Sequence, residues 1–268
     1  MTSHSAKLSD RAVIRLSGPD WKAMLQGLIT NTVDKIAPDS WLYAGLLSPQ
    51  GKYLFDFFIT RDGEDAVMDV AAEQRDTLVR KLMMYRLRSK VDITPTDDAI
   101  YAHWGETFDT HLDPRLPAMG QRRLQGEDTA SAQDYKAHRI RLGIPDGPLD
   151  FIADKTLWLE TNADLLNGVD FQKGCYVGQE NTARMRYRGK VRRRLIPIQS
   201  DAPIPEHTPI MLGRKQAGDT RSSSGTHALA NLRVEDLNKE PFMVGDTEIK
   251  AWIPEWLKET VEAAREPA

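Results

Sequence analysis

The alternation of apolar and polar residues in the first hundred positions predicts a compact unit of strands and helices. A short apolar run at 12–16 predicts a strand, and apolar residues at helical spacing over 21–28 predict a helix after it. Two runs within 41–60, separated by a turn that contains proline and glycine, predict a β-hairpin.

The same unit continues with a strand at 66–70, a helix over 73–87 and a strand at 90–93. The predicted order is therefore strand–helix–strand–strand–strand–helix–strand. This order favours an α+β fold in which helices back an antiparallel sheet.

The pattern changes twice in the rest of the chain. Over 94–130 the periodicity weakens, which predicts an irregular connection with at most one short strand, and 131–142 predicts a helix. Beyond the basic stretch, short runs rich in proline and branched residues predict a small β-barrel or sandwich. We therefore divide the chain into residues 1–189, with two subdomains whose boundary lies near 94–130, and a C-terminal β-barrel domain over 190–268.

Composition narrows the class of protein only moderately. With 268 residues, 40% apolar and 28% charged, the chain is typical of a soluble globular protein, and no apolar run approaches the roughly 20 residues that cross a bilayer. The net charge of −3 argues against a globally basic nucleic-acid binder, although local patches stay possible. A single cysteine fits a reducing compartment, and the N-terminal residues show no targeting segment. We expect a cytoplasmic protein, or one of the mitochondrial matrix in a eukaryote.

The only cysteine, Cys175, lies in a glycine-flanked loop just before a helix that we predict to begin near Gly178. Unpaired N–H groups and the positive end of the helix dipole favour a thiolate at such a position. A nucleophilic, redox-sensitive or metal-binding thiol is one interpretation, and a small buried apolar residue is the other. Spacing alone identifies no partner base and no self-contained metal site.

A dense group of basic residues follows the cysteine: Arg184, Arg186, Arg188, Lys190, Arg192, Arg193 and Arg194. Such a run is commonly a solvated face. However, these like charges repel one another, and an anionic ligand such as a phosphate backbone or a chain of carboxylates would relieve the repulsion. Aromatic residues near the predicted sheet, Tyr43 and Tyr85 among them, are candidates either for the core or for contact with a flat ring.

The segment KGCYVGQE, residues 173–180, resembles the signature of the YgfZ family of folate-binding proteins, which are related to the aminomethyltransferase (T-protein) of the glycine cleavage system. The resemblance extends over DRAVIRLSGPD, YAGLLSPQGKYLFDFFIT, MYRLRSKVDI, DPRLPAMG and GTHALANLR. It implies a T-protein-like arrangement of domains around a central opening that binds tetrahydrofolate, and a C-terminal β-barrel. It also implies a role in maturing or maintaining iron–sulfur proteins, including radical enzymes that thiolate transfer RNA.

The resemblance also assigns residues. The family motif is filled by Lys173, Gly174, Cys175, Tyr176, Gly178, Gln179 and Glu180. Glu160 falls where T-protein-like chains place a carboxylate that accepts hydrogen bonds from the pterin ring. By contrast, Leu78 stands where the T-protein has a helical aspartate, and Asp76, two positions away, points to another side of the helix. This difference argues against aminomethyl transfer.

These observations combine into one hypothesis. Folate occupies the central cavity beside Cys175, and its polyglutamate tail runs toward the cations Arg184, Arg186, Arg188, Lys190, Arg192 and Arg194. The protein then acts with iron–sulfur assembly proteins and client enzymes, because one cysteine cannot hold a cluster that needs about four ligands. The alternatives are a tetrahydrofolate-dependent one-carbon transferase and a transfer-RNA-binding module, for which only Tyr187 offers a stacking ring within the basic stretch.

Overall fold

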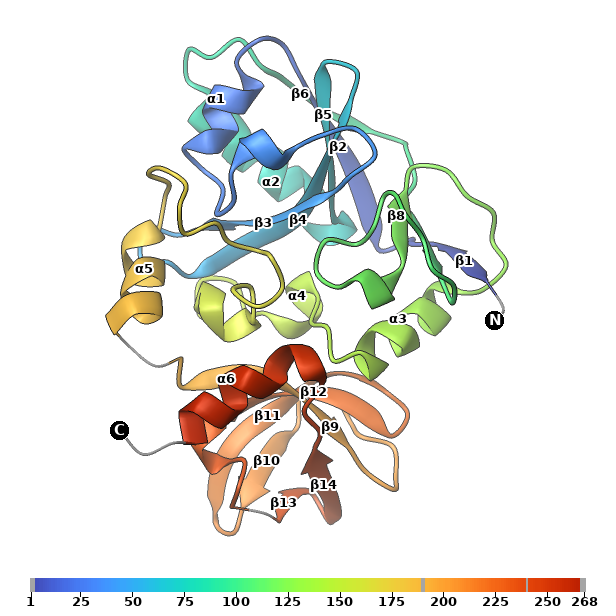
Figure 1. Cartoon of the computed structure of the whole chain (residues 1–268), viewed down its shortest axis with the longest axis vertical. Helices are drawn as coiled ribbons and strands as arrows, with labels where there is room; N and C mark the ends of the chain where they lie inside the picture. The colour runs from blue at the N-terminus through green and yellow to red at the C-terminus, as the bar shows by residue number, and fades with distance from the viewer. Residues whose placement is uncertain (1–2, 189–190, 240, 266–268) are drawn as a thin grey trace.

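The computed structural model describes residues 3–188, 191–239 and 241–265, which form three packed units (Figure 1). The α+β class and the C-terminal barrel are as predicted. In the described ranges, no helix is both long and apolar enough to cross a membrane. Short 3-10 helices connect several elements: η1 Val33–Lys35, η2 Ala72–Gln74, η3 Pro117–Met119, η4 Trp158–Thr161 and η5 Val234–Asp236.

The first unit is a five-stranded antiparallel sheet in the order β3-β4-β5-β2-β6. Its strands are β2 Arg11–Ser17, β3 Leu42–Leu47, β4 Tyr53–Asp62, β5 Asp65–Ala71 and β6 Asp92–Thr96. Helices α1 Trp21–Gln26 and α2 Arg75–Arg86 accompany them, so the predicted order of strands and helices is confirmed.

The second unit is a small antiparallel sheet that the sequence pattern largely missed. It consists of β1 His4–Lys7, β7 Tyr101–Trp104 and β8 Gln121–Arg123, in the order β1-β7-β8. Strands of three or four residues are too short to show an alternating pattern, and the pairing of β1 with β7 joins distant segments. The helix predicted at 131–142 is present as α3 Ala132–Arg141, with Ser131 forming a capping box.

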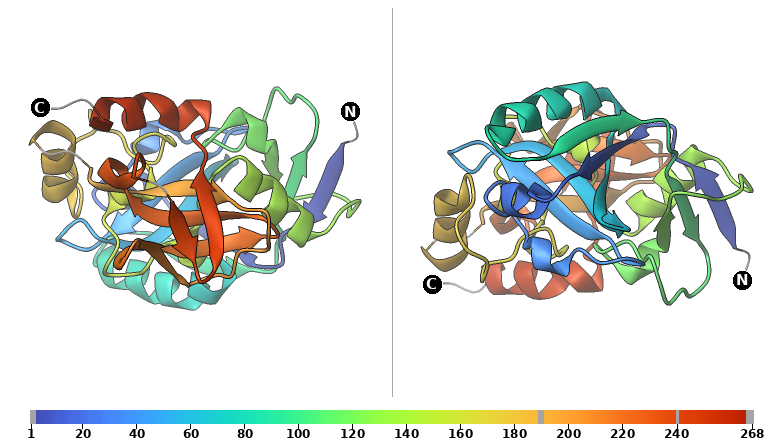
Figure 2. Two further views of the ribbon diagram at one scale, coloured as in Figure 1. Left: turned by 90° about the horizontal axis from the view of Figure 1, so that it is seen from below. Right: turned by 90° about the horizontal axis from the view of Figure 1, so that it is seen from above.

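The third unit is a closed barrel of six strands, in the order β10-β11-β12-β9-β14-β13. The strands are β9 Arg193–Gln199, β10 Pro209–Leu212, β11 Lys215–Ser224, β12 His227–Arg233, β13 Phe242–Val244 and β14 Thr247–Ala251. Two helices flank the junction with the rest of the chain, α4 Gly147–Asp150 and α5 Gln179–Arg188, and α6 Glu255–Arg265 packs on the barrel through Leu257 and Val261. Figure 2 shows α6 lying alongside the barrel.

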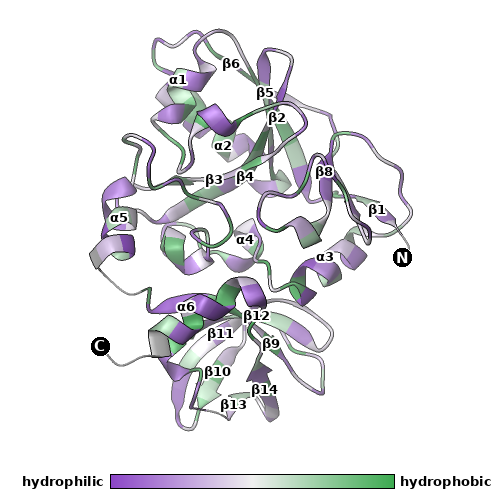
Figure 3. Cartoon of the chain, viewed as in Figure 1, coloured by the Kyte–Doolittle hydropathy of each residue, from purple (hydrophilic) through white to green (hydrophobic). Residues whose placement is uncertain are grey.

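The five-stranded sheet is buried on both faces, because successive side chains of a strand point to opposite sides. Phe57 of β4 packs with α1 and α2 in one core, whereas its neighbour Phe58 packs in a second core. That second core also contains Tyr43 and Trp158, and it joins the large sheet to the small one. Figure 3 shows hydrophobic residues along the inner strands and hydrophilic residues on α5.

A network of buried charges ties the two sheets together. Asp69 of β5 accepts a hydrogen bond from Arg11 Nε at 2.6 Å and pairs with Arg122 of β8. Arg122 Nε also donates to Asp113 at 3.1 Å, and Arg115 donates to both carboxylate oxygens of Asp113, at 3.0 and 2.8 Å. Because a buried charge without a partner is strongly unfavourable, this network fixes how the sheets sit against each other.

The same network reaches the barrel. Arg139 of α3 donates to Asp150 at 3.0 Å, and the other oxygen of Asp150 accepts from the backbone N–H and hydroxyl of Ser222 in β11, at 2.9 and 2.6 Å. Arg115 adds a contact of 3.4 Å to Asp146. The three units are therefore connected by buried ion pairs and, at the barrel, by hydrogen bonds to Ser222.

Asp56 is one further buried carboxyl close to this network. The hydroxyls of Tyr43 and Tyr53 donate to its two oxygens at 3.2 and 3.1 Å. Burial, and then the negative charge of Asp146, raise the pKa of Asp56 to about 6. Four buried guanidinium groups already face four aspartates in the network, so the additional carboxylate lacks a cation of its own.

We expect Asp56→Asn to change how stability depends on pH. Because the folded pKa of Asp56 is about 6 against 3.8 for an unperturbed aspartate, the folded protein binds the proton more tightly, and stability falls as pH rises through this window. The variant cannot ionise at this position. Between pH 4 and pH 7, its free energy of unfolding should therefore rise by about 2 kcal/mol relative to that of the natural chain. Denaturant titrations across this range measure the difference. Parallel curves for the two proteins would contradict the assignment.

Candidate functional site at the cysteine loop

Cys175 is exposed, in the loop that leads into α5. The predicted helix start is confirmed, because α5 begins at Gln179, directly after Gly178. Gly178 has a φ of +86°, and a Cβ atom there would lie 2.5 Å from the backbone oxygen of Ser48, so only glycine fits. By contrast, a Cβ atom at Gly174 would meet nothing within 4 Å. The loop is thus tightly packed at its end and open beside the thiol.

Lys173 anchors the other side of the loop. Its Nζ donates to the backbone oxygens of Gln26, Ile29 and Asn31 at 2.9, 2.6 and 2.9 Å. Three acceptors use all the N–H bonds of an ammonium group. Burial lowers the pKa of Lys173 to about 8. The side chain predicted to bind a ligand therefore holds the cysteine loop against the segment between α1 and β3.

The remaining motif residues also support the loop. The Tyr176 ring lies 5.1 Å from Lys173 Nζ, and burial raises the pKa of Tyr176 to about 12. Gln179 Oε1 accepts from the backbone N–H of Tyr176 at 3.1 Å. Glu180 is exposed and forms an ion pair of 3.5 Å with Arg184. These contacts position the thiol, and they give a structural reason for each of these residue types.

The exposed part of the basic cluster is smaller than the sequence suggested. Arg184, Arg186 and Arg192 are exposed, and Arg186 lies 5.3 Å from the ring of Phe171. Tyr187, whose side chain is 71% exposed, contacts the edge of the same ring. Two other members, the Arg188 side chain and Lys190, lie outside the described residues. The helix therefore presents cations and an aromatic ring on the surface next to the cysteine loop.

Arg194 does not belong to this exposed surface, which corrects the expectation that it lies with the other cations of the basic stretch. It is 3% exposed and donates to both oxygens of Asp164 at 2.8 and 2.9 Å. Arg193 donates to backbone oxygens of the barrel. Strand β9 begins at Arg193, so the basic run is divided between a helix and a buried strand. Spacing along the chain could not reveal Asp164 as the partner.

The side chains expected around a pterin ring do not surround one hollow. Tyr43 is 2% exposed, stacks on Phe58 and lies at a tilt against Trp158, whereas Tyr85 of α2 packs against the first core. Glu160 Oε2 accepts from the backbone N–H of Leu157, the residue before its own 3-10 helix, at 3.2 Å, and burial raises the pKa of this carboxyl. These three residues thus have separate structural roles.

Side chains of the two cores occupy the space beside β3 and α2. The indole of Trp158 lies against Gly45 of β3, where an added Cβ atom would be 2.9 Å from the ring. Leu78, at the position of the T-protein aspartate, is 1% exposed in the first core, and the exposed Asp76 pairs with Arg75. The helix supplies no carboxylate toward the centre at these positions.

Two of the predicted arginines, Arg186 and Arg194, line a cavity of about 440 Å³ between η4, α5 and α6. Its walls also include apolar side chains and the two carboxylates Asp164 and Glu259; the complete lining is Leu159, Asp164, Leu165, Met185, Arg186, Val191, Arg194, Glu259, Thr260 and Ala263. The cavity combines apolar walls with a cation at its edge.

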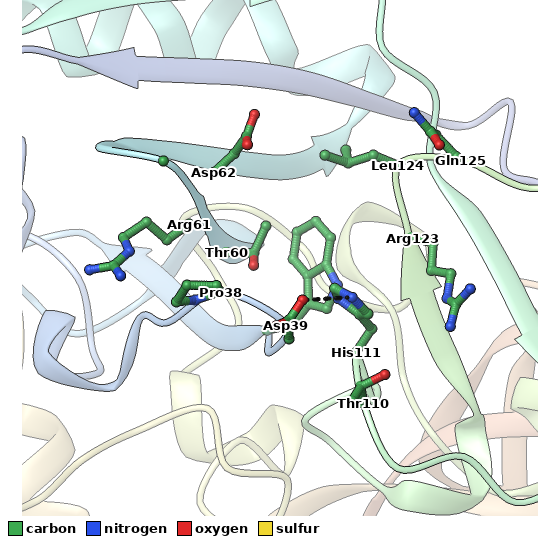
Figure 4. A pocket seen from close by; sticks show the side chains of 12 residues that line it. Pro38, Asp39, Thr60, Arg61, Asp62, Thr110, His111, Arg123, Leu124 and Gln125 are labelled. Atoms are coloured by element: carbon green, nitrogen blue, oxygen red, sulfur yellow. Dashed lines mark ion pairs between the residues drawn. The ribbon is translucent and has the colours of Figure 1, made fainter.

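A second cavity, of about 580 Å³, lies between the β4–β5 hairpin and β8 (Figure 4). Asp39 and His111 point toward each other there, with 3.3 Å between their oxygen and nitrogen atoms, and Arg61 and Arg123 stand on opposite sides of the pair. Both Asp39 and His111 have positive φ angles, of 61° and 51°. Sequence reasoning missed this pocket, because its walls come from distant segments without a recognisable motif.

Comparison with known proteins places the chain. Residues 192–259 match the CAF17 C-terminal beta-barrel domain family. The fold is similar to the glycine cleavage system aminomethyltransferase T of Bartonella henselae, with a TM-score of 0.71 and 12% identity over 93% of this chain and 84% of the other. This similarity confirms the T-protein-like fold.

Several curated relatives carry the same name. The chain is 35% identical over 226 residues to the iron–sulfur cluster assembly factor IBA57 homolog, mitochondrial, of Mycosarcoma maydis, covering 72% of this chain and 56% of that protein. It is 30% identical over 302 residues to iron–sulfur cluster assembly factor IBA57, mitochondrial, of Mus musculus, covering 93% and 84%. The chain spans about half the length of fungal relatives such as the first.

The cysteine motif resembles that of the YgfZ family, which is related to the IBA57 family. The relatives described above are named IBA57 and not YgfZ. The chain covers 84% of the mouse protein at 30% identity, and its fold and C-terminal barrel agree with the same family. The chain belongs to the IBA57 family of iron–sulfur cluster assembly factors.

Proposed function

We propose that this protein acts in iron–sulfur cluster assembly by presenting the Cys175 thiol to a protein partner. The observation that carries the proposal is the geometry of the loop. Lys173 and Gly178 fix its two ends, whereas Cys175 and Gly174 between them are exposed. A thiol held outward on an anchored loop suits contact with a ligand from outside the chain better than a role in packing.

The number of ligands that an iron–sulfur cluster needs implies that this chain works with a partner protein. Within residues 3–188, 191–239 and 241–265, no group of three or more His, Cys, Asp or Glu side chains is arranged to hold a metal ion. Clusters generally need about four protein ligands, of which this chain supplies one cysteine. A cluster handled by this protein would therefore be its cargo, bound by Cys175 together with side chains of the partner.

The exposed arginines support this role electrostatically. Arg184, Arg186 and Arg192 lie on α5 and at the start of the barrel, near the anchored loop. A cluster ligated by thiolates is anionic, so nearby positive charge attracts it. The arginines would thus attract the cargo.

The partners and the compartment follow from the same proposal. Iron–sulfur assembly proteins would bring or accept the cluster, and client enzymes, such as radical enzymes that thiolate transfer RNA, would receive it. The named relatives are mitochondrial proteins. We propose the mitochondrial matrix as the site of action in a eukaryote and the cytoplasm in a bacterium.

We also propose that tetrahydrofolate binds in the cavity between η4, α5 and α6. The T-protein-like fold motivates a folate ligand. The apolar walls of Leu159, Leu165 and Met185 suit the faces of a flat ring, and Arg186 at the edge suits a carboxylate tail. The Nε of Arg194 is buried without a hydrogen-bond partner among the described residues, which leaves one donor for a bound group.

We expect Cys175→Ser to abolish function without affecting the fold. Cells that lack the endogenous factor should recover their iron–sulfur enzyme activities with the natural chain and not with the variant, because serine is a poor ligand for iron and a weak nucleophile. Gly174→Ala is the matched control, since its added methyl group meets nothing within 4 Å. Equal melting temperatures would confirm intact folding. Full rescue by Cys175→Ser would refute the role of the thiol.

We expect polyglutamyl tetrahydrofolate to bind more tightly than the monoglutamyl form at low salt, since each glutamate adds a carboxylate near Arg186. The gain should shrink as salt screens the charges, and Arg186→Glu should remove it. Calorimetric titration measures both affinities. Arg214→Glu, on an exposed turn of the barrel, is the control. Equal affinities for the two folates would exclude the tail contact.

Two alternatives are decided by parallel assays. Transfer of the one-carbon unit of methylene-tetrahydrofolate would indicate a transferase, although Leu78 supplies no acid for that reaction. Retention on transfer RNA at physiological salt, abolished by Arg184→Glu with Arg192→Glu, would indicate RNA binding in which Tyr187 stacks on a base.

A further inference from the structure

Three of the six large apolar side chains that are exposed in the described part of the chain lie together at the end of α2. Met83, Met84 and Leu87 are 48%, 70% and 85% exposed. The inward side of the same helix carries Leu78 and Leu82, which are buried in the first core. The helix is therefore already anchored, and the outward apolar residues add nothing to its attachment.

Leu87 is unusual for a second reason. It follows the last residue of α2 with a φ of 47° and a ψ of −109°, a conformation that glycine adopts easily and leucine does not. Leu87 is 85% exposed, so packing within the described chain does little to compensate for the strain. A strained, solvated leucine is explained if its partner lies outside the chain.

The surroundings of these residues are strongly basic. Residues 75–90 contain six basic side chains, Arg75, Arg80, Lys81, Arg86, Arg88 and Lys90, and a single acidic one, Asp76, in a chain whose net charge is −3. Among the described residues, none with a carboxylate lies within 4 Å of the charged groups of Arg80, Arg88 or Lys90. A shallow hollow beside Leu87 is lined by Asp20, Arg88 and Ser89, and the Asp20 carboxylate accepts from the backbone N–H of Lys90 at 2.7 Å.

We infer that this α2 face, composed of Arg80, Met83, Met84, Leu87 and Arg88, docks an acidic amphipathic segment of a partner protein. The apolar side chains would bury the hydrophobic side of the segment, and the arginines would pair with its carboxylates. Methionine suits such a surface, because its flexible thioether adapts to partners of different shape.

Two other occupants fit these observations less well. Proteins that bind single-stranded nucleic acid combine a basic groove with aromatic rings on which bases stack, and the α2 face offers no such ring. Helices that bind membrane surfaces expose a long apolar side, whereas the apolar side of α2 is mostly buried, with Leu78 and Leu82 in the core. Charge and apolar residues in one small area are characteristic of a protein contact.

The position of the face suggests how it would be used. In both views of Figure 2, α2 and α5 lie on different sides of the molecule. A partner held at α2 would leave the loop before α5 uncovered. The inference goes beyond the proposed function. It shares with that function only the assumption that the partner is a protein.

The probe is a short fluorescein-labelled helical peptide with leucines along one side and glutamates along the other. We expect saturable binding to the full chain by fluorescence anisotropy, weaker at high salt. Met84→Ser with Leu87→Ser should reduce affinity about tenfold or more. Arg80→Glu with Arg88→Glu should do the same, and a peptide with lysines in place of glutamates should not bind.

Matched controls separate the face from general surface effects. Ile152→Ser removes another apolar side chain, 39% exposed, and Arg214→Glu reverses another exposed charge, and both should bind the peptide normally. Leu87→Gly relieves the strained backbone, so its melting temperature should not fall while its peptide affinity does. This variant shows that any loss of binding does not arise from unfolding.

Several results would overturn the inference. The inference fails if the natural chain does not bind the peptide, or if the Met84/Leu87 and Arg80/Arg88 double variants bind it as well as the natural chain does. It also fails if the control variants lose as much peptide affinity as these double variants. Binding of phosphatidylcholine–cardiolipin vesicles or transfer RNA that is lost in the same variants, without peptide binding, would assign the face to lipid or RNA instead. Cys175→Ser should bind the peptide normally, so failure of the thiol hypothesis and failure of this one are distinguishable.

Discussion

The carboxylate of Asp69 lies where the large sheet meets the small one, and the arrangement of the whole molecule depends on its pairing with Arg11 and Arg122. All three side chains are buried, so the attraction between them is not weakened by water. Loss of one partner would leave an uncompensated charge in the interior, which is far less favourable than loss of the whole pair. The two sheets therefore have one stable relative position.

The fixed position of the two sheets also determines where the cysteine loop lies. Arg11, Arg115 and Arg122 lie over the Phe58 ring of the second core, and this core holds Trp158 against β3. The chain runs from Trp158 to the loop that Lys173 anchors. Function in this protein would thus be built on rigidity, with an exposed thiol on a loop whose ends are fixed. The barrel is joined to the same framework through Asp150 and Ser222, so it is not an independent appendage.

Sequence reasoning reached the fold class, the order of elements in the first unit and the start of α5, because each leaves a local pattern of apolar spacing or turn residues. It failed where a residue's role depends on a distant partner. Arg194 looked like its basic neighbours until Asp164 appeared beside it, and Tyr43 looked like a ligand contact until Trp158 covered it. The short strands β1 and β8 were missed because they contain too few residues to alternate.

The barrel has one more consequence, which concerns how other proteins can bind. A closed set of six strands has no outer strand to which an incoming strand could add. In the large sheet, the outer strand β6 contains Pro95, which cannot donate to a neighbour, and Ile29 bridges to β3 at the opposite border. Recognition by strand addition is therefore disfavoured at these borders, and association there must rely on side chains, whose identity can change during evolution without disturbing the backbone.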